Sequence, residues 1–149
     1  MTERVDFYVL KSAAAKQRWA FACRLTEKAY LRDLSIVIAN DTLADARALD
    51  DLLWTFSERS FIPHSVCVDG HSADPAAKVH LTVPPTSLPS ADLLVNLATQ
   101  LPADWERYSR IAEIIDADAE RRRLGRERFK VYRDLKVTLE THQLDDTDE

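Results

Sequence analysis

The chain has 149 residues and a formal net charge of −5, which is a typical size for one domain with its own core. Hydrophobic residues make up 46% and charged residues 30%, a globular composition that excludes low-complexity and repeat classes. The excess of acidic residues disfavours a protein that binds nucleic acid through its overall charge. No apolar run reaches the roughly 18 residues of a membrane span, and the first residues lack the pattern of a signal peptide, so we expect a cytoplasmic protein.

Strands and helices are expected to alternate along the chain. Asp6 to Leu10 is a β-rich run, and residues 12–31 contain neither glycine nor proline, so a strand followed by a helix is predicted. Further strands are expected at residues 35–39, 65–68, 78–83, 93–97 and 113–115, helices at 41–54, 105–111 and 117–135, and residues 136–140 can add an edge strand. Asn40 or Asp41 is expected to cap the helix at 41–54.

This alternation implies crossover connections and a mainly parallel sheet. The predicted fold class is therefore α/β, a three-layer Rossmann-like single domain without a nucleotide-binding loop. We expect this domain to span residues 1–144. Residues 145–149 form an acidic tail that repels itself and buries nothing, so disorder is expected there.

The devices of nucleotide and metal chemistry are not found in the sequence. The chain has two glycines, Gly70 and Gly125, and the first strand-to-helix junction, where a phosphate would bind, has none. The four histidines are scattered without metal-ligand spacing, and Cys23 and Cys67 are expected to be buried free thiols. We therefore predict no cofactor, no metal, no small-molecule substrate and no catalytic residue.

The predicted last helix is rich in cations, which are Arg121, Arg122, Arg123, Arg126, Arg128, Lys130 and Arg133. At roughly 100° per residue, Leu124, Val131 and Leu135 fall on one face and are predicted to form its buried stripe, with Arg128 and Tyr132 at its edge. The opposite face then carries Phe129 in water, among the arginines at positions 122, 126 and 133. Such a patch suits an acidic peptide that ends in a carboxylate beside a hydrophobic residue. Single-stranded nucleic acid, with bases stacked on Phe129, is the alternative ligand.

A second patch is predicted around Trp54, which lies off the apolar stripe of its helix, and the following segment Ser60 to His64. Exposed aromatic residues beside a loop often mark a protein interface. The alternative, in which Phe61 and Ile62 fold back into the core, stays open.

Six segments resemble, in order and spacing, the chi subunit family of the bacterial DNA polymerase III clamp-loader assembly. They are RVDFYVL at 4–10, ARALDDLLWTF at 46–56, SFIPH at 60–64, DLLVNLA at 92–98, RYSRIAEIID at 107–116, and GRERFKVYRD with LETHQL at 125–144. The likeness covers about residues 4–144.

The resemblance implies a non-catalytic adaptor that pairs one-to-one with the psi subunit, contacts DNA only indirectly, and grips the acidic C-terminal tail of single-stranded DNA-binding protein. Matched residue by residue, Ile115, Arg126 and Phe129 would contact the tail, with Arg122 and Arg133 in support. The psi surface would be formed by Trp54, Phe61, Pro63 and His64. A direct single-stranded DNA binder and a nucleotide-dependent enzyme remain the rival functions.

Overall fold

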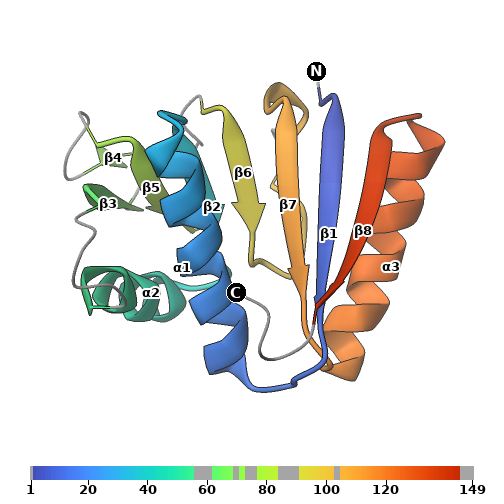
Figure 1. The fold of residues 1–149 in the computed structure, drawn as a ribbon, viewed down its shortest axis with the longest axis horizontal. Helices are drawn as coiled ribbons and strands as arrows, with labels where there is room; N and C mark the ends of the chain where they lie inside the picture. Colours follow the sequence, from blue (N-terminus) through green and yellow to red (C-terminus); the bar gives the residue numbers. More distant parts are fainter. Residues whose placement is uncertain are drawn as a thin grey trace.

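The computed structural model describes residues 2–55, 62–68, 71–72, 77–83, 91–102 and 105–144 (Figure 1). Its strands are β1 (Arg4–Leu10), β2 (Ile36–Ala39), β3 (His64–Val68), β4 (His71–Ser72), β5 (Val79–Thr82), β6 (Leu93–Asn96), β7 (Arg110–Ile115) and β8 (Thr138–Leu144). The helices are α1 (Ala15–Leu31), α2 (Leu43–Thr55), the 3₁₀ turn η1 (Trp105–Arg107) and α3 (Ala119–Asp134). The predicted tail at 145–149 and the predicted interface residue Phe61 lie outside the described residues.

The strands form one sheet in the order β4-β3-β5-β2-β6-β7-β1-β8. Every pairing in it is parallel except that of β3 with β4. The predicted α/β class with a mainly parallel sheet is confirmed. β8 is the expected edge strand, but it extends over residues 138–144 and pairs with β1 along its whole length.

Helices cover both faces of the sheet, which makes the three predicted layers (Figure 1). One buried cluster joins α1 and α2 to the sheet, and it includes Phe21, Leu49 and Leu53. The other cluster lies on the α3 side and includes Phe7 and Tyr132. Cys23 and Cys67 are both buried free thiols, as predicted. Within the described residues, no helix combines the length and the apolar character needed to cross a bilayer.

Two local predictions were wrong at element boundaries. The helix expected at 105–111 is only the short turn η1, because residues from Arg110 onward pair with β1 and β6 as part of β7. The cap of α2 is Thr42, whose Oγ1 accepts a hydrogen bond from the Asp45 amide at 3.1 Å. Asp41 instead accepts a hydrogen bond from the Thr99 amide at 2.8 Å and so ties two loops together.

The predicted buried stripe of α3 was also wrong. Val131 is 44% exposed and Leu135 is 55% exposed, whereas the buried positions of α3 are Gly125, Arg128 and Tyr132. At 100° per residue the true stripe is rotated by roughly 70° from the predicted one. Phe129 consequently lies at the border of the buried face and is half-buried, where the sequence had predicted a ring in water.

Candidate functional site

A pocket of about 280 Å³ lies between α3 and the edge of the sheet formed by β7, β1 and β8. Its lining residues are Phe7, Val9, Ile115, Arg122, Gly125, Arg126, Phe129, Thr141 and Gln143. Four of the five residues predicted for tail binding therefore come together here. The fifth, Arg133, does not line the pocket, and its guanidinium lies 3.6 Å from the Asp134 carboxylate.

The apolar part of the pocket is built by strand alternation. Phe7 and Val9 point to the α3 side of β1, because successive side chains of a strand face opposite ways. The Phe129 ring contacts the Phe7 ring with centroids 5.3 Å apart and an interplanar angle of 58°. This contact holds Phe129 in place and leaves part of its ring facing the pocket.

Gly125 allows α3 to approach β7 closely. A Cβ atom at this position would lie 2.8 Å from Cδ1 of Ile115, which is closer than van der Waals contact permits. The missing side chain therefore leaves room for Ile115 beneath the helix, and Ile115 contributes to the apolar lining.

The cations of α3 differ in whether they have an acidic partner. Arg121, Arg123 and Arg128 form ion pairs with Asp116, Glu120 and Glu113 at 2.7, 2.6 and 2.9 Å. Arg126, by contrast, has no hydrogen-bond or ion-pair partner within the described part of the chain, and it is exposed at the rim of the pocket. Its guanidinium is thus available for an anionic ligand.

The start of α3 is fixed by a buried carboxylate. Asp116 accepts two hydrogen bonds from Arg121, at 2.8 and 2.7 Å, and one from the Asp118 amide at 3.1 Å. Burial would raise the pKa of Asp116, but these hydrogen bonds outweigh burial and hold its pKa below the ordinary value. Arg122 donates from Nε to the Asp116 carbonyl at 3.0 Å, which anchors this side chain at the pocket.

A polar network beneath α3 explains why the helix is rotated. Glu113 is fully buried on β7 and accepts hydrogen bonds from Arg128 at 2.9 Å, Tyr132 at 2.7 Å and Asn96 at 3.1 Å. Burial, followed by the nearby Glu113 charge, strongly raises the pKa of Tyr132, so the phenol stays protonated and donates. A buried carboxylate must be compensated by such donors, and the face of α3 that carries Arg128 and Tyr132 turns inward for that reason.

The second predicted patch is only partly at the surface. Trp54 is 49% exposed, and the centroid of its ring lies 4.4 Å from the centroid of the His64 ring. His64 itself is buried, with Nδ1 2.7 Å from the Ile62 carbonyl and Nε2 2.9 Å from the Asp50 carboxylate. Ile62 is buried in the core and Pro63 is half-buried. The buried His64 ring therefore packs against the inner side of the Trp54 ring. Trp54 is the exposed member of the described patch.

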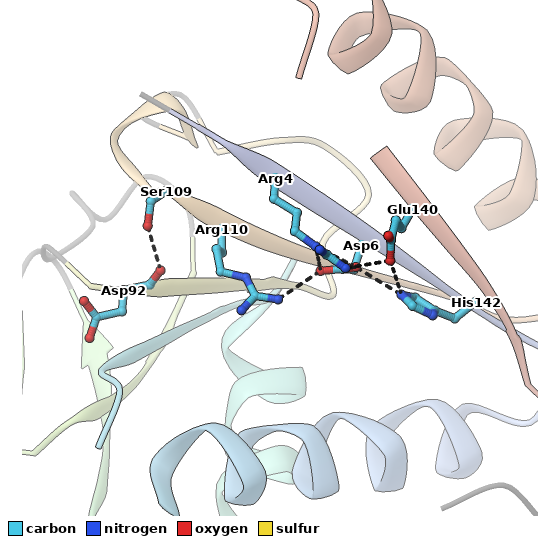
Figure 2. Close-up of polar contacts among 7 residues, drawn as sticks. All are labelled: Arg4, Asp6, Asp92, Ser109, Arg110, Glu140 and His142. Carbon is cyan, nitrogen blue, oxygen red and sulfur yellow. Dashed lines mark hydrogen bonds and ion pairs between the residues drawn. The ribbon is translucent and has the colours of Figure 1, made fainter. Parts of the chain in front are cut away.

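A charged cluster on the opposite face of the sheet was not anticipated from the sequence. Asp6, Glu140 and His142 bring their ligand-type atoms within 4.8 Å of one another. The Arg4 guanidinium lies between the two carboxylates, 2.9 Å from Asp6 and 2.6 Å from Glu140, as Figure 2 shows. The positive charge of Arg4 thus already neutralises these carboxylates.

Sequence reasoning also missed several pocket residues. Phe7 and Val9 of β1, and Thr141 and Gln143 of β8, line the pocket, yet they are more than 130 positions apart in the chain and meet only through the β1–β8 pairing. The period-two alternation within each strand was a usable signal for which side chains share a face. The pairing of the two strands was not predictable from that alternation.

The fold and the pocket together define a Rossmann-like α/β domain whose candidate site is a basic surface pocket with an apolar lining. One chain of a solved S. cerevisiae complex of a Dbp5 variant with Nup159, Gle1, IP6 and ADP has the same architecture, with a TM-score of 0.62 at 14% identity. The match covers 97% of this chain but only 42% of that chain, and at this identity the likeness concerns the fold alone.

Residues 1–140 match the family described as DNA polymerase III chi subunit, HolC. The DNA polymerase III subunit chi of Pseudomonas aeruginosa is 35% identical over 141 residues, which is 95% of this chain and 96% of that protein. The subunit chi of Escherichia coli is 25% identical over 120 residues, or 80% of each chain. The chain belongs to the DNA polymerase III chi subunit family, whose members are replication accessory subunits.

Proposed function

We propose that this chain is a non-catalytic adaptor of the DNA polymerase III replicase, which grips the acidic C-terminal tail of single-stranded DNA-binding protein in the α3 pocket. The observation that carries the proposal is the pairing of an apolar lining with unneutralised arginine at one pocket. Ile115 and Phe129 supply the apolar lining, and Arg122 and Arg126 supply the charge. This combination suits a peptide with a carboxylate beside a hydrophobic side chain.

Each residue has a distinct role in this proposal. Arg126 binds the terminal carboxylate, since a guanidinium fork matches the two carboxylate oxygens. Phe129 and Ile115 hold the last hydrophobic side chain of the tail. Arg122 attracts acidic residues further upstream, and Arg133, which lies outside the pocket, adds a long-range attraction. Because these charged contacts are partly exposed, each is modest, and micromolar affinity that weakens with salt is expected.

A calorimetric titration with a tail peptide and its C-terminally amidated form tests this function. The amide keeps every side chain but removes the charge at the chain end, so we expect it to bind about tenfold more weakly. Equal affinities of the two peptides would remove the carboxylate from the mechanism. Failure of the peptide with a free C-terminal carboxylate to bind would remove the function itself.

The charge distribution of α3 argues against direct binding of single-stranded DNA. Four of its cations already face carboxylates, namely Arg121, Arg123, Arg128 and Arg133. The remaining cations are too few for the extended positive groove that such proteins use to follow a phosphate backbone. Fluorescence anisotropy with a labelled oligonucleotide alone is expected to show no binding at physiological salt.

We further propose that the Trp54 surface receives the psi subunit and so tethers the chain to the clamp loader. The supporting observation is a large aromatic residue, 49% exposed, whose ring contacts a buried histidine at an interplanar angle of 47°. Aromatic anchors of this kind often dominate the energy of an interface. Trp54→Ala is expected to abolish co-elution with psi, whereas Leu31→Ala, which removes another exposed apolar residue, is expected to leave it unchanged. Retention of psi by Trp54→Ala would refute this surface.

A further inference from the structure

β8 is an edge strand without a fully buried side chain. It lies at the edge of the sheet, and its ladder partner in the described structure is β1. None of its side chains is buried; Leu139, His142 and Leu144 are half-buried and the others are exposed. Strands with few buried contacts open locally at low free-energy cost. The position of β8 must therefore depend on its backbone ladder and on particular side-chain contacts.

One side of β8 forms a wall of the pocket. Thr141 and Gln143 face α3 and line the pocket opposite Arg122, Arg126 and Phe129. If β8 moves away from β1, this wall is lost and the pocket opens to solvent on that side. The shape of the pocket thus depends on whether β8 is docked.

The other side of β8 carries the charged cluster of Figure 2, which we call the β8 clasp and define as Arg4, Asp6, Glu140 and His142. Arg4 of β1 binds Glu140 of β8 at 2.6 Å, and Asp6 of β1 binds His142 of β8 at 3.0 Å. In the strand register, Asp6 lies opposite Glu140 and Tyr8 lies opposite His142. Each polar link is therefore diagonal and joins residues that are two positions apart in the register.

Two further contacts make the clasp more rigid than an exposed ion pair. The His142 ring stacks on Tyr8 with centroids 4.8 Å apart and an interplanar angle of 16°. Asp6 is nearly buried and is also bound by Arg110 of β7 at 3.3 Å. Burial would raise the pKa of Asp6, but hydrogen bonds from Arg4, His142 and Arg110 outweigh it and lower the pKa overall, so the carboxylate is held charged at neutral pH.

We infer that the β8 clasp positions the β8 wall of the pocket, so that docking of β8 and binding of an acidic peptide end are coupled across the sheet. This inference rests on the proposed function of the pocket and adds a structural element that controls binding there. The clasp residues touch no peptide; they are positioning residues that act through Thr141 and Gln143. By linkage, a peptide that needs the docked strand must in turn hold that strand down.

The test combines calorimetry with amide hydrogen exchange of Thr138–Leu144 in the full chain. His142→Ala and Glu140→Gln are expected to speed exchange in β8 and to weaken tail-peptide affinity about fivefold. Saturating peptide is expected to slow β8 exchange in the wild type and in both variants. His142→Gln, which can still donate to Asp6, is expected to recover part of the affinity.

Asp33→Asn is the matched control, because it neutralises the exposed Asp33–Lys78 ion pair far from β8 and asparagine tolerates the positive φ of 64° at this position. It is expected to change neither readout. Peptide binding to the wild type without any slowing of β8 exchange, or unchanged affinity in both clasp variants, would overturn the coupling alone. A wild type that binds no peptide would overturn the proposed function and the coupling with it.

Discussion

Replacing Arg126 by alanine separates ligand binding from folding. Arg126 is exposed at the pocket rim and has no partner in the described residues, so its removal should change the free energy of unfolding by less than about 0.5 kcal/mol. A hydrogen bond between charged groups contributes about 1.5–3 kcal/mol, and the exposed rim places Arg126 at the lower end. Arg126→Ala is therefore expected to raise the Kd for a tail peptide about tenfold and to flatten its salt dependence.

The matched control is Arg123→Ala on the same helix. Arg123 is paired with Glu120 and Glu127 at 2.6 and 3.0 Å and does not line the pocket. Its loss removes one positive charge, as Arg126→Ala does, and should leave the Kd within about twofold because exposed charges are screened by salt. Isothermal titration calorimetry at two salt concentrations measures both variants. Equal weakening by the two substitutions would mean that net charge drives binding, and an unchanged Kd in Arg126→Ala would refute the role of this residue.

Three further predictions follow from the contacts of α3. Tyr132→Phe removes a buried 2.7 Å hydrogen bond to Glu113 and should lower the unfolding free energy by about 1–3 kcal/mol in urea denaturation; an unchanged midpoint would contradict the network. Asp116→Asn should destabilise the chain at pH 7, because the pKa of Asp116 is lowered in the folded chain and its carboxylate therefore stabilises the fold at pH values above the pKa of the unfolded chain. This loss of stability should shrink as the pH falls below about 4 and the carboxylate is protonated; a pH-independent difference would refute this. Gly125→Ala adds a methyl group 2.8 Å from Cδ1 of Ile115 and should weaken peptide binding about threefold. The higher helix propensity of alanine, about 1 kcal/mol, should offset the cost of this close contact, so the free energy of unfolding should change little. Unaltered affinity would show that the Ile115 side chain moves aside without effect on the pocket.

Much of the architecture followed from local pattern. The apolar run Ile36–Ala39 and the strand Leu93–Asn96, apolar except for Asn96, are buried at every position, as strands covered on both faces must be. Helix spacing grouped Arg122, Arg126 and Phe129 on one face of the last helix, whereas Ile115 came only from the resemblance to the chi family; all four line one pocket. The alternation of strands and helices was sufficient for the class of fold because crossover connections leave few alternatives.

The orientation of α3 could not be predicted by counting apolar residues. The helix buries Arg128 and Tyr132 against Glu113 and leaves Val131 and Leu135 exposed. A pattern of hydrophobicity places Arg128 only at the edge of the buried stripe, whereas a charge paired in the interior behaves as part of the core. The missing information was the burial of Glu113, which depends on strands far away in the sequence.

The β8 wall was unpredictable for a different reason. Thr141 and Gln143 have no local signal of a site, and their position depends on parallel pairing with β1, with Phe7 opposite Thr141 and Val9 opposite Gln143. Such non-local pairings are not encoded in the periodicity of either strand. The same pairing places Glu140 and His142 beside Arg4 and Asp6 on the other face.

The most direct test of the account is an NMR titration of the ¹⁵N-labelled chain with the acidic tail peptide. We expect amide shifts to concentrate in β8 and in the first half of α3, around Arg122 and Arg126, and the amidated peptide to reproduce them more weakly. Shifts centred on Trp54, or spread evenly over the arginine-bearing surface of α3, would contradict the claim that this pocket receives the end of another protein's chain.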